Sequence, residues 1–405
     1  MFNLQEVRAQ FPALKQKVHG QDLVYLDSAA TTLKPQSVID RINQYYSFET
    51  ANVHRGAHYL SDMATAEFEK ARETIRQFIN ASTTEEIIFT KGTTEGLNLI
   101  ACSYGENFLN EGDEIVITEL EHHANIVPWQ VLAQKKNCQL KFISVDAQGE
   151  LDYGSLDKMI TSKTKIVSFS GCSNILGTMI SVEKVVQKAK SVGAVTILDA
   201  AQLVSQEIID VQKWGVDFLV FSAHKLFGPY GFGVLFGRKA LLVKMPPYQT
   251  GGSMISCVDF KSTTYNDLPF KFEAGTPHIE GAIGTAAAID FFRSFNIRDI
   301  FNHEQKLMTQ LKIGFSEIPE IRLFGVAAQK AAIVSFTMNG AHHSDIGQIL
   351  DQQGVAVRVG HHCTQPLLKK FNLTGTVRAS ISIYNSENDI QRLIESVKKA
   401  KRMLL

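Results

Sequence analysis

Residues 216–236 read Val-Asp-Phe-Leu-Val-Phe-Ser-Ala-His-Lys-Leu-Phe-Gly-Pro-Tyr-Gly-Phe-Gly-Val-Leu-Phe, and the other elements are ordered around this stretch. Its first apolar run, 218–221, predicts a buried strand that delivers Ser222, His224 and Lys225 to its end. A turn rich in glycine and proline and a second apolar run follow. Burial lowers the pKa of a lysine and makes its amine a nucleophile able to form a Schiff base. For Lys225 taken alone, a loop lysine that reaches solvent is the simpler explanation.

The composition excludes several classes of protein. The chain has 405 residues, enough for a large core and two domains. The chain has 41 lysines and arginines and 41 aspartates and glutamates, so it has no excess of positive charge that would attract nucleic acid. No apolar run is long enough to span a membrane, and the N-terminal segment lacks the apolar core of a signal peptide, so the sequence predicts a cytoplasmic protein. The five cysteines are odd in number and scattered, which predicts neither a disulfide framework nor a paired metal site.

Two patterns of elements predict two domains. From residue 86 onward, helices such as 94–109 and 182–192 alternate with strands, which are expected at 87–90, 114–118, 140–145, 165–170, 195–199 and 218–221. This alternation predicts a mainly parallel sheet covered by helices on both faces, with ligands at the carboxyl ends of the strands. The later elements are helices 281–295, 298–318, 344–353 and 387–403 and strands 331–338, 355–358 and 377–383. We therefore expect a large α/β domain over 20–280 and a smaller α+β domain over 281–405, on which residues 1–19 pack.

Three strand ends of the large domain carry polar motifs. The segment 91–96, Lys-Gly-Thr-Thr-Glu-Gly, opens a helix and resembles a phosphate cradle, although an ordinary N-cap fits equally well. Asp199 ends a buried strand and needs a cationic partner such as a protonated pyridine nitrogen, unless it caps the next helix. His122 follows a third strand and either stacks on a planar cofactor or lies in a solvated loop. A strand that ends in Asp199 and another that is followed by Lys225 are together more specific evidence for such a site than either residue alone.

A further motif lies in the smaller domain. Residues 358–366 read Arg-Val-Gly-His-His-Cys-Thr-Gln-Pro, and the histidines and Arg358 favour the thiolate of Cys363. A buried inert cysteine and a metal site are the alternatives, but no second Cys/His pair has suitable spacing for a metal. Arg378 lies in the apolar run 377–383 and should face a carboxylate, either of the protein or of a substrate.

Together these motifs resemble the pyridoxal-phosphate enzymes of the aminotransferase class V superfamily, and specifically the SufS-type (group II) cysteine desulfurases. The matching blocks cover nearly the whole chain in family order: 25–30, 53–56, 92–96, 121–130, 173–177, 199–202, 222–229, 272–277, 358–363 and 378–380. The resemblance implies a fold-type I transferase whose large domain holds a mainly parallel seven-stranded sheet. The chain departs from the family at Ala200 and Ala223, where glycine is frequent, and at Gly171 and Cys172, where a histidine-containing stretch is usual. The short segment between Arg358 and Cys363 is typical of the SufS-type group.

The resemblance also implies roles for individual residues. Lys225 bonds the cofactor, pyridoxal 5'-phosphate, and then moves protons, while Cys363 attacks the substrate sulfur and His122 stacks on the cofactor ring. Asp199 pairs with the pyridinium nitrogen and Gln202 with the ring hydroxyl. The phosphate is held by Thr94, Ser222 and His224, with Thr276 from a partner subunit. Asn174 and Arg378 hold the substrate carboxylate, and Arg358 lies beside the reactive cysteine.

The implied reaction converts L-cysteine to L-alanine with a persulfide on Cys363. The sulfur would pass to a SufE- or SufU-like acceptor for iron–sulfur cluster assembly, in a homodimer without a metal, nucleic-acid or membrane partner. A selenocysteine lyase uses the same site and is one alternative, which Cys363→Ala tested on both substrates separates. A class V aminotransferase, which needs no thiol, and a non-enzymatic metal- or partner-binding protein are the others.

Overall fold

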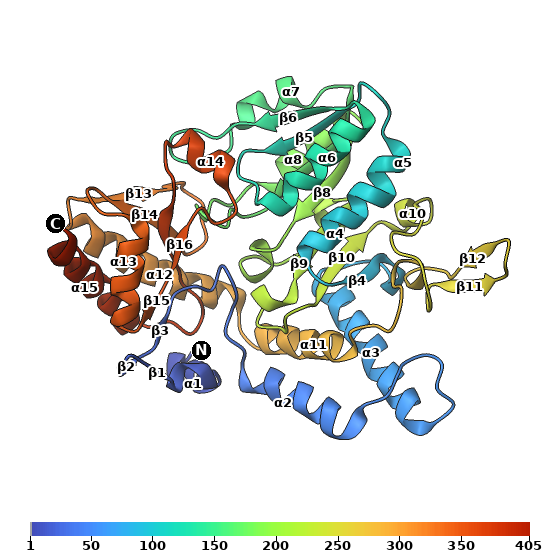
Figure 1. Ribbon diagram of the computed structural model, residues 1–405, viewed down its shortest axis with the longest axis horizontal. Helices are drawn as coiled ribbons and strands as arrows, with labels where there is room; N and C mark the ends of the chain where they lie inside the picture. Colours follow the sequence, from blue (N-terminus) through green and yellow to red (C-terminus); the bar gives the residue numbers. More distant parts are fainter. Residues whose placement is uncertain (1) are drawn as a thin grey trace.

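A seven-stranded sheet forms the centre of the molecule, seen in a computed structural model that describes residues 2–405 (Figure 1). Its strand order is β4-β10-β9-β8-β7-β5-β6. The strands are β4 Ile87–Thr90, β5 Glu114–Thr118, β6 Gln139–Ile143, β7 Thr164–Ser170, β8 Val195–Asp199, β9 Phe218–Ser222 and β10 Gly233–Gly237. All neighbours pair in parallel except β10, which is antiparallel to both β9 and β4. The predicted mainly parallel sheet of seven strands is confirmed.

Both faces of this sheet are buried, which explains its nearly continuous apolar strands. On β9, Leu219 and Phe221 pack into the apolar cluster on one face, and Phe218 and Val220 into the cluster on the other. The second cluster includes α4 (Thr93–Leu99) and α6 (Val127–Lys136), and the first includes α8 (Val182–Ser191). The helices cover the two faces of the sheet, so the carboxyl ends of β7, β8 and β9 remain accessible.

The helix expected over 94–109 is not a single α-helix. It runs as α4, then as the π-helical segment η4 (Ile100–Gly105), and then as α5 (Glu106–Phe108). A side chain at Gly105 would lie 2.3 Å from Cδ2 of Leu132, so α6 approaches the backbone closely here. The wider turn falls where this neighbouring helix is packed, a tertiary effect that sequence periodicity does not encode.

A four-stranded antiparallel sheet forms a second unit, with strand order β13-β14-β17-β16. Its strands are β13 Ile321–Phe324, β14 Ile333–Met338, β17 Thr376–Ser380 and β16 Arg358–Gly360. The accompanying helices are α12 Ile297–Ser316, α13 His343–Gln352 and α15 Glu387–Leu404. The strand expected over 355–358 is divided, because β15 (Val355–Ala356) leaves this sheet and pairs in parallel with β3 (Val24–Tyr25).

Helix α11 (Ile279–Arg293) packs against α2 (Gln36–Gln44) and α3 (Tyr59–Phe78), which lie beside the large sheet. We therefore propose that the smaller unit begins between α11 and α12, slightly later than the boundary expected at residue 281. At the other end of the chain, Arg8 of α1 (Leu4–Ala9) donates to Asp389 at 2.7 Å. This contact ties the first helix to α15.

The remaining elements are short. They are β1 Lys17–Val18, β2 Gln21–Asp22, α7 Leu156–Met159, α9 Val211–Trp214, α10 Lys239–Leu242, β11 Ile255–Val258, β12 Thr263–Tyr265 and α14 Gln365–Lys370. Strands β11 and β12 form a hairpin that stands away from the body of the molecule (Figure 1). Across residues 2–405, no helix combines the length and the apolar character that a membrane span requires.

Candidate active site

A cavity of about 300 Å³ opens where the strand ends of the large sheet meet the loop that follows β16. Nearly all residues predicted for the site line it: Thr94, His122, Asn174, Asp199, Gln202, Ser222, His224, Lys225, Arg358, Cys363 and Arg378. Thr276 does not, because it lines a separate cavity with Lys91, Glu95 and Tyr248. Residues far apart in the sequence, from both units of the fold, therefore share one site.

Lys225 is positioned by the peptide bond that precedes it. After β9, the chain turns through the 3-10 helix η8 (Ala223–Lys225), and the carbonyl oxygen of His224 accepts four hydrogen bonds. The donors are the N–H of Thr32 at 3.0 Å and the side chains of Thr31, Thr32 and Lys34 at 3.1 Å each. Burial lowers the pKa of Lys225, although the nearby Asp199 carboxylate opposes the shift. The site therefore favours the neutral, nucleophilic amine.

Lys34 was not anticipated from the sequence. Its ammonium group lies 5.0 Å from the centre of the Tyr230 ring, and no carboxylate of residues 2–405 forms an ion pair with it. Burial lowers the pKa of Lys34 to about 7. Lys34 donates to the carbonyl oxygens of Thr32 at 2.8 Å and His224 at 3.1 Å. Nothing in the segment Thr-Thr-Leu-Lys indicates the second contact, because His224 lies nearly two hundred positions later in the chain.

Asp199 is a buried carboxylate at the end of β8. The N–H of Ala201 donates to its Oδ1 at 2.9 Å, and within the described chain no lysine or arginine forms an ion pair with it. Burial raises the pKa of Asp199, while the Ala201 N–H and the charge of Lys225 oppose the rise. A buried carboxylate without a cation is costly, so the position suits a cationic partner from a ligand.

His122 presents a neutral imidazole to the cavity. Its Nδ1 accepts a hydrogen bond from the N–H of Ala124 at 3.0 Å. Burial, followed by the charge of Lys225, lowers the pKa of His122 to about 4. A flat, uncharged ring held in this way can stack on a planar cofactor.

An anion-binding corner lies at the start of α4. The N–H of Thr93 donates to Oγ of Ser222 at 2.8 Å, and the Thr93 hydroxyl lies 2.9 Å from the same oxygen. Among the described residues, Nδ1 of His224 is buried without a hydrogen-bond partner, and burial lowers the pKa of His224 to about 4. Hydroxyls, free backbone donors and an unpaired ring nitrogen form a set that fits a phosphate group.

Taken together, the cavity residues fit pyridoxal phosphate. Lys225 matches its aldehyde, Asp199 its ring nitrogen, His122 its ring face and the corner around Ser222 its phosphate. Gln202 lies at the same wall, where its side-chain amide donates to the carbonyl oxygen of Ala29 at 2.6 Å.

The loop that carries Cys363 is held in an unusual conformation. His362 and Cys363 have φ values of 49° and 56°, the left-handed region that residues other than glycine rarely adopt. Asn174 donates through its Nδ2 to the carbonyl oxygen of His362 at 2.8 Å, and the N–H of His123 donates to that of Cys363 at 2.8 Å. Contacts from the large unit therefore maintain a conformation that the loop alone would not favour.

The side chain of His362 anchors this loop to Thr376. Its Nε2 lies 3.2 Å from the carbonyl oxygen and 3.0 Å from the hydroxyl of Thr376. Because a carbonyl can only accept, we assign the ring proton to Nε2. Burial lowers the pKa of His362 to about 3, so the ring stays neutral. The sequence placed His362 next to the thiol but gave no reason to expect a supporting role.

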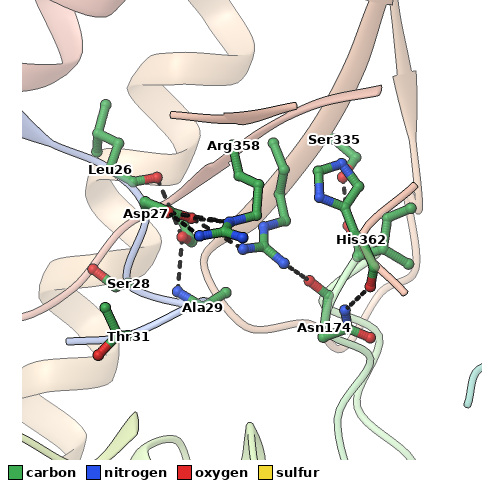
Figure 2. Close-up of polar contacts among 12 residues, drawn as sticks. Leu26, Asp27, Ser28, Ala29, Thr31, Asn174, Ser335, Arg358 and His362 are labelled. Carbon is green, nitrogen blue, oxygen red and sulfur yellow. Dashed lines mark hydrogen bonds and ion pairs between the residues drawn. The ribbon is translucent and has the colours of Figure 1, made fainter. Parts of the chain in front are cut away.

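The two arginines of the cavity share one carboxylate, that of Asp27 (Figure 2). Arg358 contacts it at 3.0 Å and Arg378 at 3.1 Å. The hydrogen bond with Asp27 raises the pKa of Arg358, whereas burial lowers that of Arg378 to about 10. Asp27 lies in the block 25–30, but the sequence alone indicates no role for it. Its position between a short apolar strand and a small-residue turn was the only available signal.

Two further titratable residues lie in the cavity wall or next to it. Cys172 lines the cavity, but burial raises its pKa to about 12, so its thiol stays protonated and is a poor nucleophile. Glu121 is buried and accepts hydrogen bonds from Asn125 and from Ser170, a residue of the cavity wall, at 2.6 Å each. Burial raises the pKa of Glu121 to about 7. Within residues 2–405, no group of three or more His, Cys, Asp or Glu side chains is arranged to hold a metal ion.

The sheet order and the cavity residues define a pyridoxal-phosphate-dependent enzyme of fold type I. The chain belongs to the aminotransferase class-V family, whose model matches residues 24–393. It is 47% identical to a probable cysteine desulfurase of Vibrio cholerae over 100% of both chains, and 44% identical to a cysteine desulfurase of Serratia proteamaculans over 100% of this chain and 99% of the relative.

Two solved structures share the fold. The cysteine desulfurase CsdA of Escherichia coli, in an S-sulfonic acid form, has a TM-score of 0.93 and 38% identity over 100% of both chains. The apo cysteine desulfurase of Thermococcus onnurineus has a TM-score of 0.92 and 38% identity, covering 97% of this chain and 99% of that one. The resemblance inferred from the sequence is therefore confirmed at the level of the family.

Proposed function

We propose that this protein is a pyridoxal-phosphate-dependent cysteine desulfurase, which converts L-cysteine to L-alanine and retains the sulfur as a persulfide on Cys363. The observation that carries the proposal is that the Cys363 thiol and the Lys225 amine line one cavity. An aminotransferase needs the lysine and Asp199 but no thiol. A cysteine that is partly exposed and held there by Asn174 and His123 favours sulfur transfer.

The residues divide the work of this reaction. When bound, pyridoxal phosphate supplies an electron sink conjugated with the substrate Cα. Arg378 and Asn174 hold the substrate carboxylate, which orients the Cα proton toward Lys225. The neutral amine of Lys225 takes that proton and later returns one, a role that requires the lowered pKa.

Cys363 performs the sulfur step. Its thiolate attacks the sulfur of the substrate, so a sulfur–sulfur bond forms as the substrate carbon–sulfur bond breaks. The electron pair of the broken bond remains with the carbon skeleton, which becomes L-alanine after protonation. Overall, L-cysteine and the Cys363 thiol give L-alanine and a persulfide, and no external oxidant is needed. Arg358 and Arg378 line the same cavity as the Cys363 thiol.

We further propose a protein acceptor of the SufE or SufU type, which would deliver the sulfur to iron–sulfur cluster assembly. Backbone contacts hold the Cys363 loop, so the persulfide cannot swing far from the cavity and must be collected at its mouth. Turnover should therefore be slow alone and should rise when such an acceptor is added. An unchanged rate at saturating acceptor would contradict this part of the proposal.

We also propose a homodimer in which Thr276 of each subunit completes the phosphate corner of the other. Its place in a separate cavity, and large exposed apolar side chains such as Phe48, Tyr59 and Phe260, support this arrangement. Lys225→Ala and Thr276→Ala subunits, each weak alone, would regain activity on mixing, because hybrid dimers hold one intact site. Absence of any recovery would argue against shared sites.

The main test incubates the cofactor-loaded protein with L-cysteine and measures alanine and sulfide. Alanine should form in the wild type and fall to background in Cys363→Ala. Cys138→Ser is the matched control, because this thiol lies outside the cavity and donates to the carbonyl oxygen of Asn110. Undiminished alanine formation by Cys363→Ala would overturn the proposed role of the thiol.

A further inference from the structure

Asp27 is the only carboxylate within the described chain that contacts either arginine of the cavity. Its backbone is fixed on both sides: the N–H of Ser380 donates to the carbonyl oxygen of Leu26 at 2.8 Å, and the N–H of Ala29 donates to Oγ of Ser380 at 2.9 Å. Ser380 lies two residues after Arg378 on β17. The carboxylate is therefore held beside the arginines by the sheet itself.

Arg378 is held from two directions. Its Nη2 donates to Oδ1 of Asp27 at 3.1 Å, and its Nη1 donates to the backbone carbonyl oxygen of Asn174 at 2.9 Å. Because the two contacts use different nitrogens, the planar group cannot rotate. Each of these nitrogens keeps one further N–H, and the guanidinium lines the cavity. These donors remain for an incoming carboxylate.

Arg358 depends on Asp27 more strongly. Its side chain is 49% exposed, and among residues 2–405 its hydrogen bonds go to Asp27 alone, through Nε and Nη2. A long side chain with such exposure has many alternative rotamers in solvent. Figure 2 shows Arg358 facing Asp27 across this contact. Without the carboxylate, nothing in the described chain would hold Arg358 over the cavity.

The charges match as well. Two guanidinium groups and one carboxylate leave a net charge of one positive unit, which one substrate carboxylate neutralises. Without Asp27, the buried Arg378 would face Arg358 with no anion between them, an unfavourable arrangement. We propose that Asp27 is a positioning residue, which sets both arginines for the substrate carboxylate and thereby determines substrate affinity. This inference rests on the proposed function for the identity of the substrate.

The test measures binding of L-alanine and of propionate to the cofactor-loaded protein by calorimetry. Asp27→Asn should raise both dissociation constants about tenfold, the loss expected when charge-assisted contacts no longer fix the arginines. Asp27→Glu keeps the charge but lengthens the side chain, so its dissociation constants should lie between those of wild type and Asp27→Asn. Unchanged or tighter binding by these variants would overturn the inference, and the Glu variant decides alone if the Asn variant does not fold.

A control variant and a double mutant distinguish positioning of the arginines by Asp27 from a general effect of Asp27 on stability. Asp389→Asn removes the partner of Arg8 outside the cavity, so it should lower the melting temperature without changing either dissociation constant. If Asp27 acts through Arg358, the loss in Asp27→Asn combined with Arg358→Gln must be smaller than the product of the single losses. An increase in the dissociation constant of the double variant equal to the product of the two single increases would overturn the inference.

The two proposals fail in different ways. If wild type forms no alanine from L-cysteine but still binds propionate, the proposed function fails, and the propionate series still decides the role of Asp27. If wild type forms alanine and the Asp27 variants bind normally, the role of Asp27 fails and the proposed function stands. If wild type binds neither propionate nor L-alanine, the inference is overturned.

Discussion

The backbone N–H of His123 donates to the carbonyl oxygen of Cys363 at 2.8 Å, which joins a loop of the large sheet to the loop that carries the thiol. His123 directly follows His122, which faces the cavity. The imidazole of His123 also accepts the N–H of Gln365 at 3.2 Å, so one residue binds both ends of a short turn. The placement of the thiol therefore depends on contact between the two units.

Replacing His123 by alanine should loosen this turn. The backbone bond to Cys363 remains, but the Gln365 N–H loses its acceptor, so amide hydrogen exchange over residues 361–367 should accelerate several-fold, with a stability loss of about 1 kcal/mol. Exchange followed by mass spectrometry measures the effect. His303→Ala is the control, because it also removes a histidine contact with the backbone, in which Nε2 of His303 donates to the carbonyl oxygen of Asn385. Equal exchange over 361–367 in wild type and His123→Ala would contradict the role of this side chain.

The buried His362 should make the folded protein less stable as the pH falls. Burial lowers its folded pKa to about 3, below the ordinary value near 6.5, so between these values the unfolded chain binds a proton that the folded chain does not. The contribution of the neutral His362 ring to the free energy of unfolding is therefore fully present above about pH 6.5 and is lost as the pH falls below that value.

His362→Gln keeps a donor for Thr376 but does not titrate. The melting temperature of wild type minus that of the variant should therefore shrink between pH 7.5 and pH 5, by roughly 1–2 °C. Taking the difference removes the opposing effects of Glu121 and Glu304, whose pKa values burial raises to about 7 and about 8. A difference that is constant or grows on acidification would show that His362 titrates in the folded protein.

Much of the large unit was predictable because its signals are local. Strands β4, β5 and β8 end where the apolar runs end, and the polar residues after them could be assigned to one cavity because parallel strands share a carboxyl edge. Strand β15 was not separable from β16 in the sequence, because its partner β3 lies more than three hundred residues earlier. The roles of Asp27 and Lys34 were missed for the same reason, since each acts on a residue from a distant part of the chain. His362 contacts Thr376 on the neighbouring strand β17, and that strand pairing was not predictable from the sequence.

Asp199→Asn should separate stability from function. In the cofactor-free protein, the substitution removes a buried carboxylate that has no ion-pair partner among residues 2–405, and it can keep the Ala201 N–H bond. The free energy of unfolding should therefore rise by about 1 kcal/mol. In the loaded enzyme, the ring nitrogen loses its anion, so alanine production should fall at least about a hundredfold. Thermal melts and turnover assays measure the two effects. Turnover within a factor of three of wild type would contradict the assigned pairing.

Lys34→Met should weaken cofactor binding without touching the cavity. The ammonium group supports the carbonyl oxygen of His224, so its loss should let the peptide before Lys225 move and should raise the cofactor dissociation constant about fivefold. Lys330→Met is the matched control: this lysine also has a pKa that burial lowers to about 7, and it donates to a backbone carbonyl, that of Gly325. Equal effects of the two substitutions on cofactor affinity would indicate general destabilisation instead.

The most direct test of the account is peptide mass spectrometry after a single exposure of the loaded enzyme to L-cysteine without an acceptor. We predict one extra sulfur atom on the peptide that contains Cys363, and no extra sulfur on the peptides of Cys102, Cys138, Cys172 or Cys257. An extra sulfur on Cys172 in place of Cys363, or alanine formation with no persulfide on Cys363, would contradict it.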